Sequence, residues 1–250
     1  MTRARPAHLR FTQRLTDARR MDSARRPLRT FLSTLVFFAL VVSGGCAFSS
    51  RAQVAAPAAQ TRPTSEPYKG DLSIFEYKDR DQKLQIQRVM DLLGISAGKT
   101  VADVGAGSGW FTTRAAARVG AGGVVYAEDI NPDAIEYIRQ RAAKEKLQNV
   151  RVLLGTPDNP RLPADSVDVV LMLKTYHEIA HPVLLLKNLT PSLRSGARIG
   201  IIDKNGNGTD HGIMPDVIER EMAQAGFKRV GKYDFTKADG QDYFLIFTRK

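Results

Sequence analysis

The sequence predicts an α/β protein with a doubly wound, seven-stranded and mostly parallel sheet that carries helices on both faces. Three observations support this fold class. Short apolar runs alternate with segments of helical periodicity in the last 180 or so residues. The first run, 101–104, leads into a glycine-rich turn, and the run 167–173 is apolar enough for a central strand buried on both faces.

The elements follow in order along the chain. Apolar runs bounded by turn residues predict the strands, and 3.6-residue periodicity predicts the helices. Asn131 is a good N-cap, with Pro132 at the first position of another helix. We expect strands at 101–104, 124–130, 150–154, 167–173, 197–203, 227–235 and 242–248, and helices at 77–93, 111–119, 182–193 and 215–225.

The turn Gly105–Gly109 joins the first strand to a helix. Glycine there permits positive φ, and the helix N-terminus presents unpaired N–H donors to a ligand. A dinucleotide-binding turn needs glycine at its sixth position, which Trp110 occupies here. This disfavours a nicotinamide oxidoreductase, and the sequence has no G-x-x-x-x-G-K-[ST] phosphate loop.

The turn resembles motif I of the class I S-adenosylmethionine-dependent methyltransferases. The resemblance covers roughly residues 72–250, and small bacterial methyltransferase-like proteins share the strings at 155–158 (G-T-P-D), 175–178 (T-Y-H-E) and 225–227 (A-G-F). It implies S-adenosylmethionine as the cofactor and transfer of its methyl group to an acceptor that the sequence does not identify. It also implies that the last strand is antiparallel.

The resemblance places the cofactor at the carboxyl ends of the strands. An acid ending the second strand would bind the ribose diol, a role that falls to Asp129, while Glu128 stands where an apolar residue is usual. Alternatively, Asp129 belongs to the start of the helix after Asn131. The expected cofactor-binding residues are Asp103, Gly105, Ala106, Gly107, Ser108, Gly109, Glu128, Asp129, Asp158, Asn159 and Lys174.

Adenine recognition departs from the family pattern. Thr156 replaces the expected acid, and Pro157 removes a backbone N–H. The resemblance then shifts this role to Asp158 or to the backbone of Asn159. An ordinary turn aspartate is an equal alternative for Asp158.

His177 follows the fourth strand at the edge where open parallel sheets bind ligands. It is the candidate catalytic residue, a base for an acceptor that must lose a proton. The alternative is a structural histidine near the methionine end of the cofactor. We expect no metal, because the pair His177 and His181 lacks a convincing third ligand.

The leading helix 77–93 is expected to bury its leucines and to keep its charged residues in solvent. Arg80 belongs to this charged set. A solvated charge run is the favoured interpretation, and contact of Arg80 and Tyr77 with substrate is the alternative.

Residues 1–46 have the order of a bacterial export signal. Arginines precede the apolar run 31–42, which is short for a membrane span, and small residues lead to the single cysteine, Cys46. We expect a lipoprotein-type signal that tethers the chain to the membrane on the periplasmic side. The alternatives are a non-lipidated export signal, an uncleaved anchor, or a spurious start and a cytoplasmic protein. Residues 47–70 are expected to be a flexible linker, and 71–250 one methyltransferase-like domain.

Charge divides the chain in the same way. Nine arginines against two aspartates give residues 1–46 a charge of +7, which leaves +4 of the total of +11 for the rest. The basic character is therefore poor evidence for a nucleic-acid partner. The favoured function is a methyltransferase, and the alternative is an exported or tethered binding protein that keeps the fold without turnover.

Overall fold

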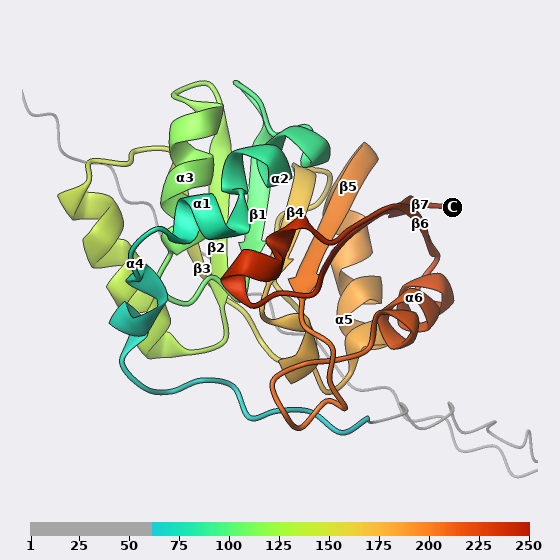
Figure 1. The fold of residues 1–250 in the computed structure, drawn as a ribbon. Coiled ribbons are helices and arrows are strands. Elements are labelled where there is room, and N and C mark those ends of the chain that lie inside the picture. The colour runs from blue at the N-terminus through green and yellow to red at the C-terminus, as the bar shows by residue number, and fades with distance from the viewer. Residues whose placement is uncertain (1–61) are drawn as a thin grey trace, which may run out of the picture. The chain divides into compact units, whose positions relative to one another are not determined.

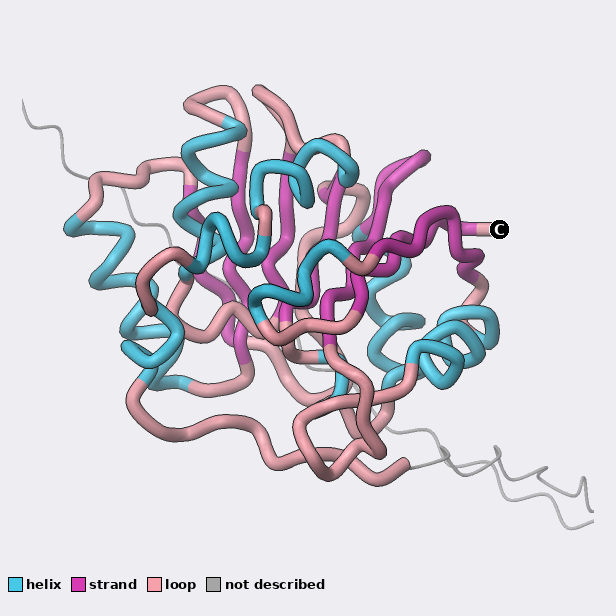
Figure 2. The backbone as a smooth tube through the Cα atoms, in the orientation of Figure 1, coloured by secondary structure: helices cyan, strands magenta, loops and turns pink. Residues whose placement is uncertain are grey.

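The computed structural model describes residues 62–250, which form a seven-stranded sheet in the order β3-β2-β1-β4-β5-β7-β6 (Figures 1 and 2). β7 is antiparallel to β5 and β6, and the other pairings are parallel. The expected fold class, including the antiparallel last strand, is confirmed. The strands are β1 (Thr100–Val104), β2 (Val124–Asp129), β3 (Val150–Leu154), β4 (Val167–Leu173), β5 (Leu193–Asp203), β6 (Phe227–Tyr233) and β7 (Tyr243–Arg249).

Helices cover both faces of the sheet (Figure 1). Because side chains alternate along a strand, Val101 packs with the helices α2, α3 and α4, whereas its neighbour Ala102 packs with α5 and α6. The helices are α1 (Arg80–Leu84), α2 (Ile86–Leu93), α3 (Trp110–Val119), α4 (Pro132–Lys144), α5 (Pro182–Leu189) and α6 (Pro215–Gln224). Short 3-10 turns occupy Leu72–Glu76, Tyr176–Glu178, Thr190–Ser192 and Phe235–Asp239.

The leading helix differs from its prediction in two ways. It is broken into α1 and α2 at Gln85, which adopts a left-handed conformation with φ of 52°. Arg80 is buried rather than solvated, because its guanidinium stacks on Trp110 at 4.1 Å and donates to the carbonyl of Phe75 at 2.7 Å. Helical periodicity alone did not show that other parts of the protein cover the side of α1 that carries Arg80.

The cap of α4 is as expected. Asn131 accepts a hydrogen bond from the N–H of Asp133 at 2.9 Å, and Pro132 is the first helical residue. Residues 1–61, with the expected export signal and Cys46, lie outside the described residues. Within 62–250, no helix has the length and apolar character needed to cross a bilayer.

The strand order determines where a ligand can bind. β1 lies between β2 and β4, so the chain leaves β1 toward one edge of the sheet and returns to β4 on its other side. Such a switch point opens a crevice at the carboxyl ends of the strands. Val104, Asp129 and Leu173 end β1, β2 and β4 beside that crevice.

The turn before β2 provides a test of this packing. A Cβ added at Gly123 would lie 2.6 Å from the carbonyl oxygen of Lys99 and 2.5 Å from Cβ of Val119, whereas at Gly122 the nearest atom would be 3.9 Å away. We expect Gly123→Ala to lower the free energy of unfolding by about 1–3 kcal/mol through overpacking. Gly122→Ala is the matched control and should unfold like the wild type in denaturant titrations. Equal stability of the two variants would contradict the close approach of Gly123 to its neighbours.

Candidate active site

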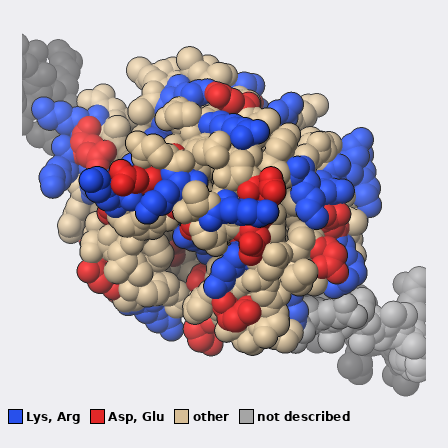
Figure 3. Space-filling model, viewed as in Figure 1, with Lys and Arg blue, Asp and Glu red and all other residues tan. Residues whose placement is uncertain are grey.

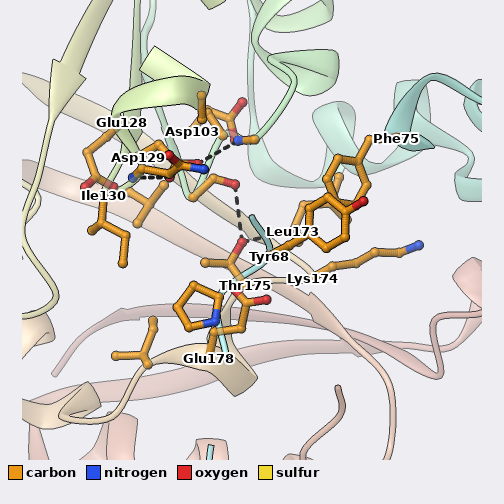
Figure 4. A pocket seen from close by; sticks show the side chains of 18 of the residues that line it. Tyr68, Phe75, Asp103, Glu128, Asp129, Ile130, Leu173, Lys174, Thr175 and Glu178 are labelled. Carbon is orange, nitrogen blue, oxygen red and sulfur yellow. Dashed lines mark hydrogen bonds between the residues drawn. The ribbon is translucent and has the colours of Figure 1, made fainter. Parts of the chain in front are cut away.

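A cavity of about 360 Å³ lies at the carboxyl ends of β1, β2 and β4. Figure 4 shows Glu128 and Asp129 on one side of it, with Tyr68 and Phe75 on the other. Its lining combines backbone of the glycine turn, apolar side chains and several carboxylates. This composition suits a small ligand with an apolar part and a few polar or cationic groups.

Hydrogen bonds tie the glycine turn to the end of β2. The N–H groups of Gly105 and Ala106 both donate to the carbonyl of Glu128 at 2.9 Å. The Asp129 carboxylate accepts from the N–H of Gly107 at 2.8 Å and from that of Asn131 at 2.9 Å (Figure 4). Asp129 thus holds both the turn and the start of α4, and each of its oxygens retains a lone pair for a ligand.

Glycine is required at the first position of this turn. Gly105 has φ of 73°, and a Cβ there would overlap the side chain of Thr175. Gly109, with the same φ, caps α3, and a Cβ on it would lie 3.2 Å from Ile138. Gly109 therefore permits α3 and α4 to approach each other and does not line the cavity.

Most of the predicted cofactor residues meet at this cavity. They come from the ends of three strands and from the turn after β1. Those that line it are Asp103, Gly105, Ala106, Gly107, Ser108, Glu128, Asp129 and Lys174. The structure does not bring Gly109, Asp158 or Asn159 to its wall.

At the end of the cavity where adenine is expected, the lining residues are Thr156 and Pro157. The predicted residues Asp158 and Asn159 do not line it. The loop closes on itself, since the N–H of Thr156 donates to the Asn159 carbonyl at 2.9 Å. Asp158 turns away and lies 2.8 Å from Nδ1 of His181. Short-range pairing in this loop thus decides which residues face the cavity.

Three acidic residues are buried around the cavity. Burial raises the pKa of Asp103 to about 7, although the hydrogen bond that the Thr112 hydroxyl donates at 2.6 Å acts to lower it. Burial also raises the pKa of Glu128 and Asp129, and the repulsion between these neighbours raises that of Glu128 further. Without a ligand, the carboxylates therefore resist ionisation, and a cation placed among them would favour their charged forms.

Two cations border the same cavity. Arg80 lines it while stacking on Trp110, and burial lowers the pKa of Arg80. Lys174 lines it at the end of β4, forms an ion pair with Asp239 at 3.4 Å, and has its pKa lowered by burial. The position of Arg80 is thus consistent with the alternative that it contacts a ligand. The favoured prediction, that Arg80 is solvated, is wrong.

Sequence reasoning missed one wall of the cavity. Residues 64–68, assigned to the flexible linker, line it together with Phe75, and Tyr68 packs edge-on against Phe75 at 5.3 Å between ring centroids. This segment is anchored because Arg62 donates to the carbonyl of Tyr176 at 2.6 Å. The sequence did contain one indication of this wall, because the aromatic residues Tyr68 and Phe75 interrupt a stretch otherwise rich in small and polar residues.

His177 lies beside this cavity, in the wall of a second one of about 430 Å³. The cavities share four lining residues: Tyr68, Phe75, Lys174 and Glu178. Nδ1 of His177 is 2.9 and 3.0 Å from the two carboxylate oxygens of Asp203, which is fully buried. Asp203 orients the ring, and the role of His177 as a base stays a prediction.

Comparison with known proteins agrees with this geometry. A family model described as "Methyltransferase domain" matches residues 95–235. A nocamycin O-methyltransferase of Saccharothrix syringae is 39% identical over 84 residues, covering 34% of this chain and 30% of that protein. A demethylmenaquinone methyltransferase of Tropheryma whipplei is 33% identical over 112 residues, covering 45% of this chain and 44% of that protein. The chain thus spans less than half the length of these curated relatives.

Among solved structures, a SAM-dependent methyltransferase from Aquifex aeolicus aligns with a TM-score of 0.64 and 25% identity. The alignment covers 72% of this chain and 98% of that one. The region matched by the family model runs from before β1 to the end of β6 and stops short of β7. The chain therefore belongs to the methyltransferase-domain family, and the expected S-adenosylmethionine-dependent enzyme class and cofactor are confirmed for this domain.

Proposed function

We propose that the protein transfers the methyl group of S-adenosylmethionine to a small acceptor bound in the second cavity. The observation that carries the proposal is the junction of the two cavities, with one built on the glycine turn and Asp129 and the other lined by His177, Lys204 and His211. Both volumes lie in the range of small-molecule sites, roughly 300–1,000 Å³.

The first cavity fits the cofactor chemically. Bare backbone at Gly107, where an added Cβ would have only Phe75 within 4 Å, leaves room for a ligand against the turn. Asp129 can accept hydrogen bonds from a ribose diol, and the buried carboxylate of Asp103 favours a nearby cation. Bound S-adenosylmethionine supplies an electrophilic methyl group on a positively charged sulfur.

The protein's contribution to such a transfer is positioning. The acceptor atom must approach the methyl carbon in line with the breaking carbon–sulfur bond, whose electron pair stays on sulfur. Tyr68, Phe75 and residues 64–67 line the cavity, where they would help to keep water from that path. Lys174 and Glu178, which line both cavities, lie where cofactor and acceptor would meet.

On the face shown in Figure 3, basic and acidic side chains are interspersed and do not form one basic stripe. A small acceptor suits this surface better than an extended polyanion, which needs clustered cations. Export and tethering through Cys46 remain predictions, because the leader lies outside residues 62–250.

Calorimetric titration of the full chain with S-adenosylmethionine and with NAD tests the proposal. We expect binding of the first ligand only, since Trp110 occupies the position that a dinucleotide turn reserves for glycine. Incubation with methyl-labelled cofactor and pooled small molecules should then label an acceptor. Tight binding without transfer to any small-molecule or protein acceptor would favour the binding-protein alternative.

The ribose contact can be tested at Asp129. Asp129→Ala removes the acceptor expected for the diol and should weaken cofactor binding by about 1–3 kcal/mol, because buried polar partners lose their hydrogen bonds. Asp133→Ala, which changes an exposed acid four residues further on, is the control and should bind like the wild type. Calorimetry measures both affinities, with circular dichroism to verify folding. An unchanged affinity of the Asp129 variant would rule out the ribose role.

Asp103 gives a prediction about pH. Its pKa of about 7 means that it is protonated below neutrality and charged above, in the field of Asp129 and Arg80. The ionised form attracts a sulfonium, so cofactor affinity should rise several-fold from about pH 6 to about pH 8. In Asp103→Asn this rise should be smaller. Because the ligand titrates identically in both experiments, the difference between the wild type and Asp103→Asn reports Asp103 alone. Identical pH profiles of the two proteins would show that Asp103 does not interact with the cofactor.

Placement of the acceptor can be tested at Lys204, which lines only the second cavity. For an acceptor found by labelling, Lys204→Met should change KM while leaving cofactor affinity unaltered, because the substitution alters the charge of that cavity alone. Lys187→Met on the exposed side of α5 is the control. If both variants show the wild-type KM, the acceptor binds elsewhere.

A further inference from the structure

Three potential metal ligands converge on the wall of the second cavity. His177 and Glu178 come from the 3-10 turn after β4, and His211 comes from the loop between β5 and α6. One ligand atom from each lies within 4.8 Å of the other two. From the sequence we expected no metal, because the pair His177 and His181 lacked a third ligand. In the structure, Nδ1 of His181 lies 2.8 Å from Asp158, and the residues that come together with His177 are Glu178 and His211.

His177 is oriented as metal-binding histidines are. Its Nδ1 faces both carboxylate oxygens of Asp203, and that carboxylate is held by the N–H groups of His177 at 3.2 Å and Lys204 at 2.9 Å. With its proton on Nδ1, the ring directs the lone pair of Nε2 away from Asp203. A buried carboxylate behind the imidazole is the usual support of a histidine ligand, because it fixes ring orientation and raises basicity.

The position of His211 is fixed by its loop. Its N–H donates to Oγ of Ser65 at 2.8 Å, and the same hydroxyl donates to the Gly208 carbonyl at 3.0 Å. The two imidazoles meet edge to face, with centroids 5.7 Å apart and planes at 90°. The hydrogen bond that fixes His211 is thus made by its backbone N–H and not by its imidazole.

One distance within the cluster is close to that of a metal site. Nε2 of His177 and Oε1 of Glu178 are 3.8 Å apart. Ligand atoms around a tetrahedral zinc lie roughly 3.4 Å from one another, given metal–ligand distances of about 2.0–2.2 Å. Side-chain shifts of less than about 1 Å would bring this pair to coordinating distance. Imidazole ligands select zinc, cobalt, nickel or iron over calcium or magnesium.

We propose that His177, Glu178 and His211 bind a divalent transition-metal cation such as Zn²⁺, with a coordination position open to the second cavity. Three protein ligands and one open position are the arrangement of catalytic rather than structural zinc sites. An acceptor hydroxyl or thiol bound there would release its proton to solvent near neutral pH. Its lone pair would then form the bond to the methyl carbon as the carbon–sulfur bond breaks. Nε2 of His177 would serve as a ligand and not as a base.

The test is titration of the full chain with Co²⁺ alone, whose visible spectrum reports coordination. The chain carries Cys46→Ser and His8→Ala, so that the cysteine and the histidine outside the described residues do not contribute. We expect one equivalent to bind with the absorption of a four- or five-coordinate ion, and added Zn²⁺ to displace it. No cofactor is present, so failure here is distinct from failure of the methyltransferase proposal.

Variants made in that background identify the ligands. His211→Ala and Glu178→Gln should each weaken Co²⁺ binding by roughly tenfold or more, as loss of a supporting group already does at metal sites. His181→Ala removes a histidine outside the cluster, whose Nδ1 lies 2.8 Å from Asp158, and should bind Co²⁺ like its parent. His211 is exposed, so its variant keeps the test valid if changes at buried His177 prevent folding. Absence of bound Co²⁺, or equal affinity of His211→Ala and its parent, would overturn the proposal.

Discussion

The hydrogen bonds of Asp129 are the constraint on which the site depends. One carboxylate holds the N–H of Gly107 and that of Asn131, so it connects the turn after β1 with the start of α4. The neighbouring N–H groups of Gly105 and Ala106 share the carbonyl of Glu128. These bonds connect the turn after β1 with the end of β2. They hold the turn in a conformation in which its backbone faces the cavity.

The same arrangement places three acidic groups together where water is scarce. Asp103, Glu128 and Asp129 are all buried, and burial raises each pKa. Keeping such groups costs stability, because a buried carboxylate is either desolvated or protonated. A site that binds a cation recovers that cost on binding. The buried acids and the sulfonium of the cofactor are therefore electrostatically complementary.

The second cavity depends on contacts between segments far apart in the sequence. Arg62 and Ser65 attach the segment before α1 to the turn after β4 and to the loop after β5. The pairing of β4 with β5, together with these attachments, brings the turn that carries His177 and Glu178 close to the loop that carries His211. The second cavity is thus assembled from contacts between distant segments, whereas much of the first cavity is built on the ends of three strands and the turn after β1.

This difference explains how much of the structure could be predicted from the sequence. Sequence alone determined the seven strands, the glycine turn and the acid at the end of β2, because strand periodicity and turn chemistry act over a few residues. Tertiary structure decided the rest. It buried Arg80 against Trp110, made residues 64–68 a wall of the cavity, and placed His211 beside His177. Each of these results depends on which surfaces meet in the folded chain, and no local pattern encodes that information.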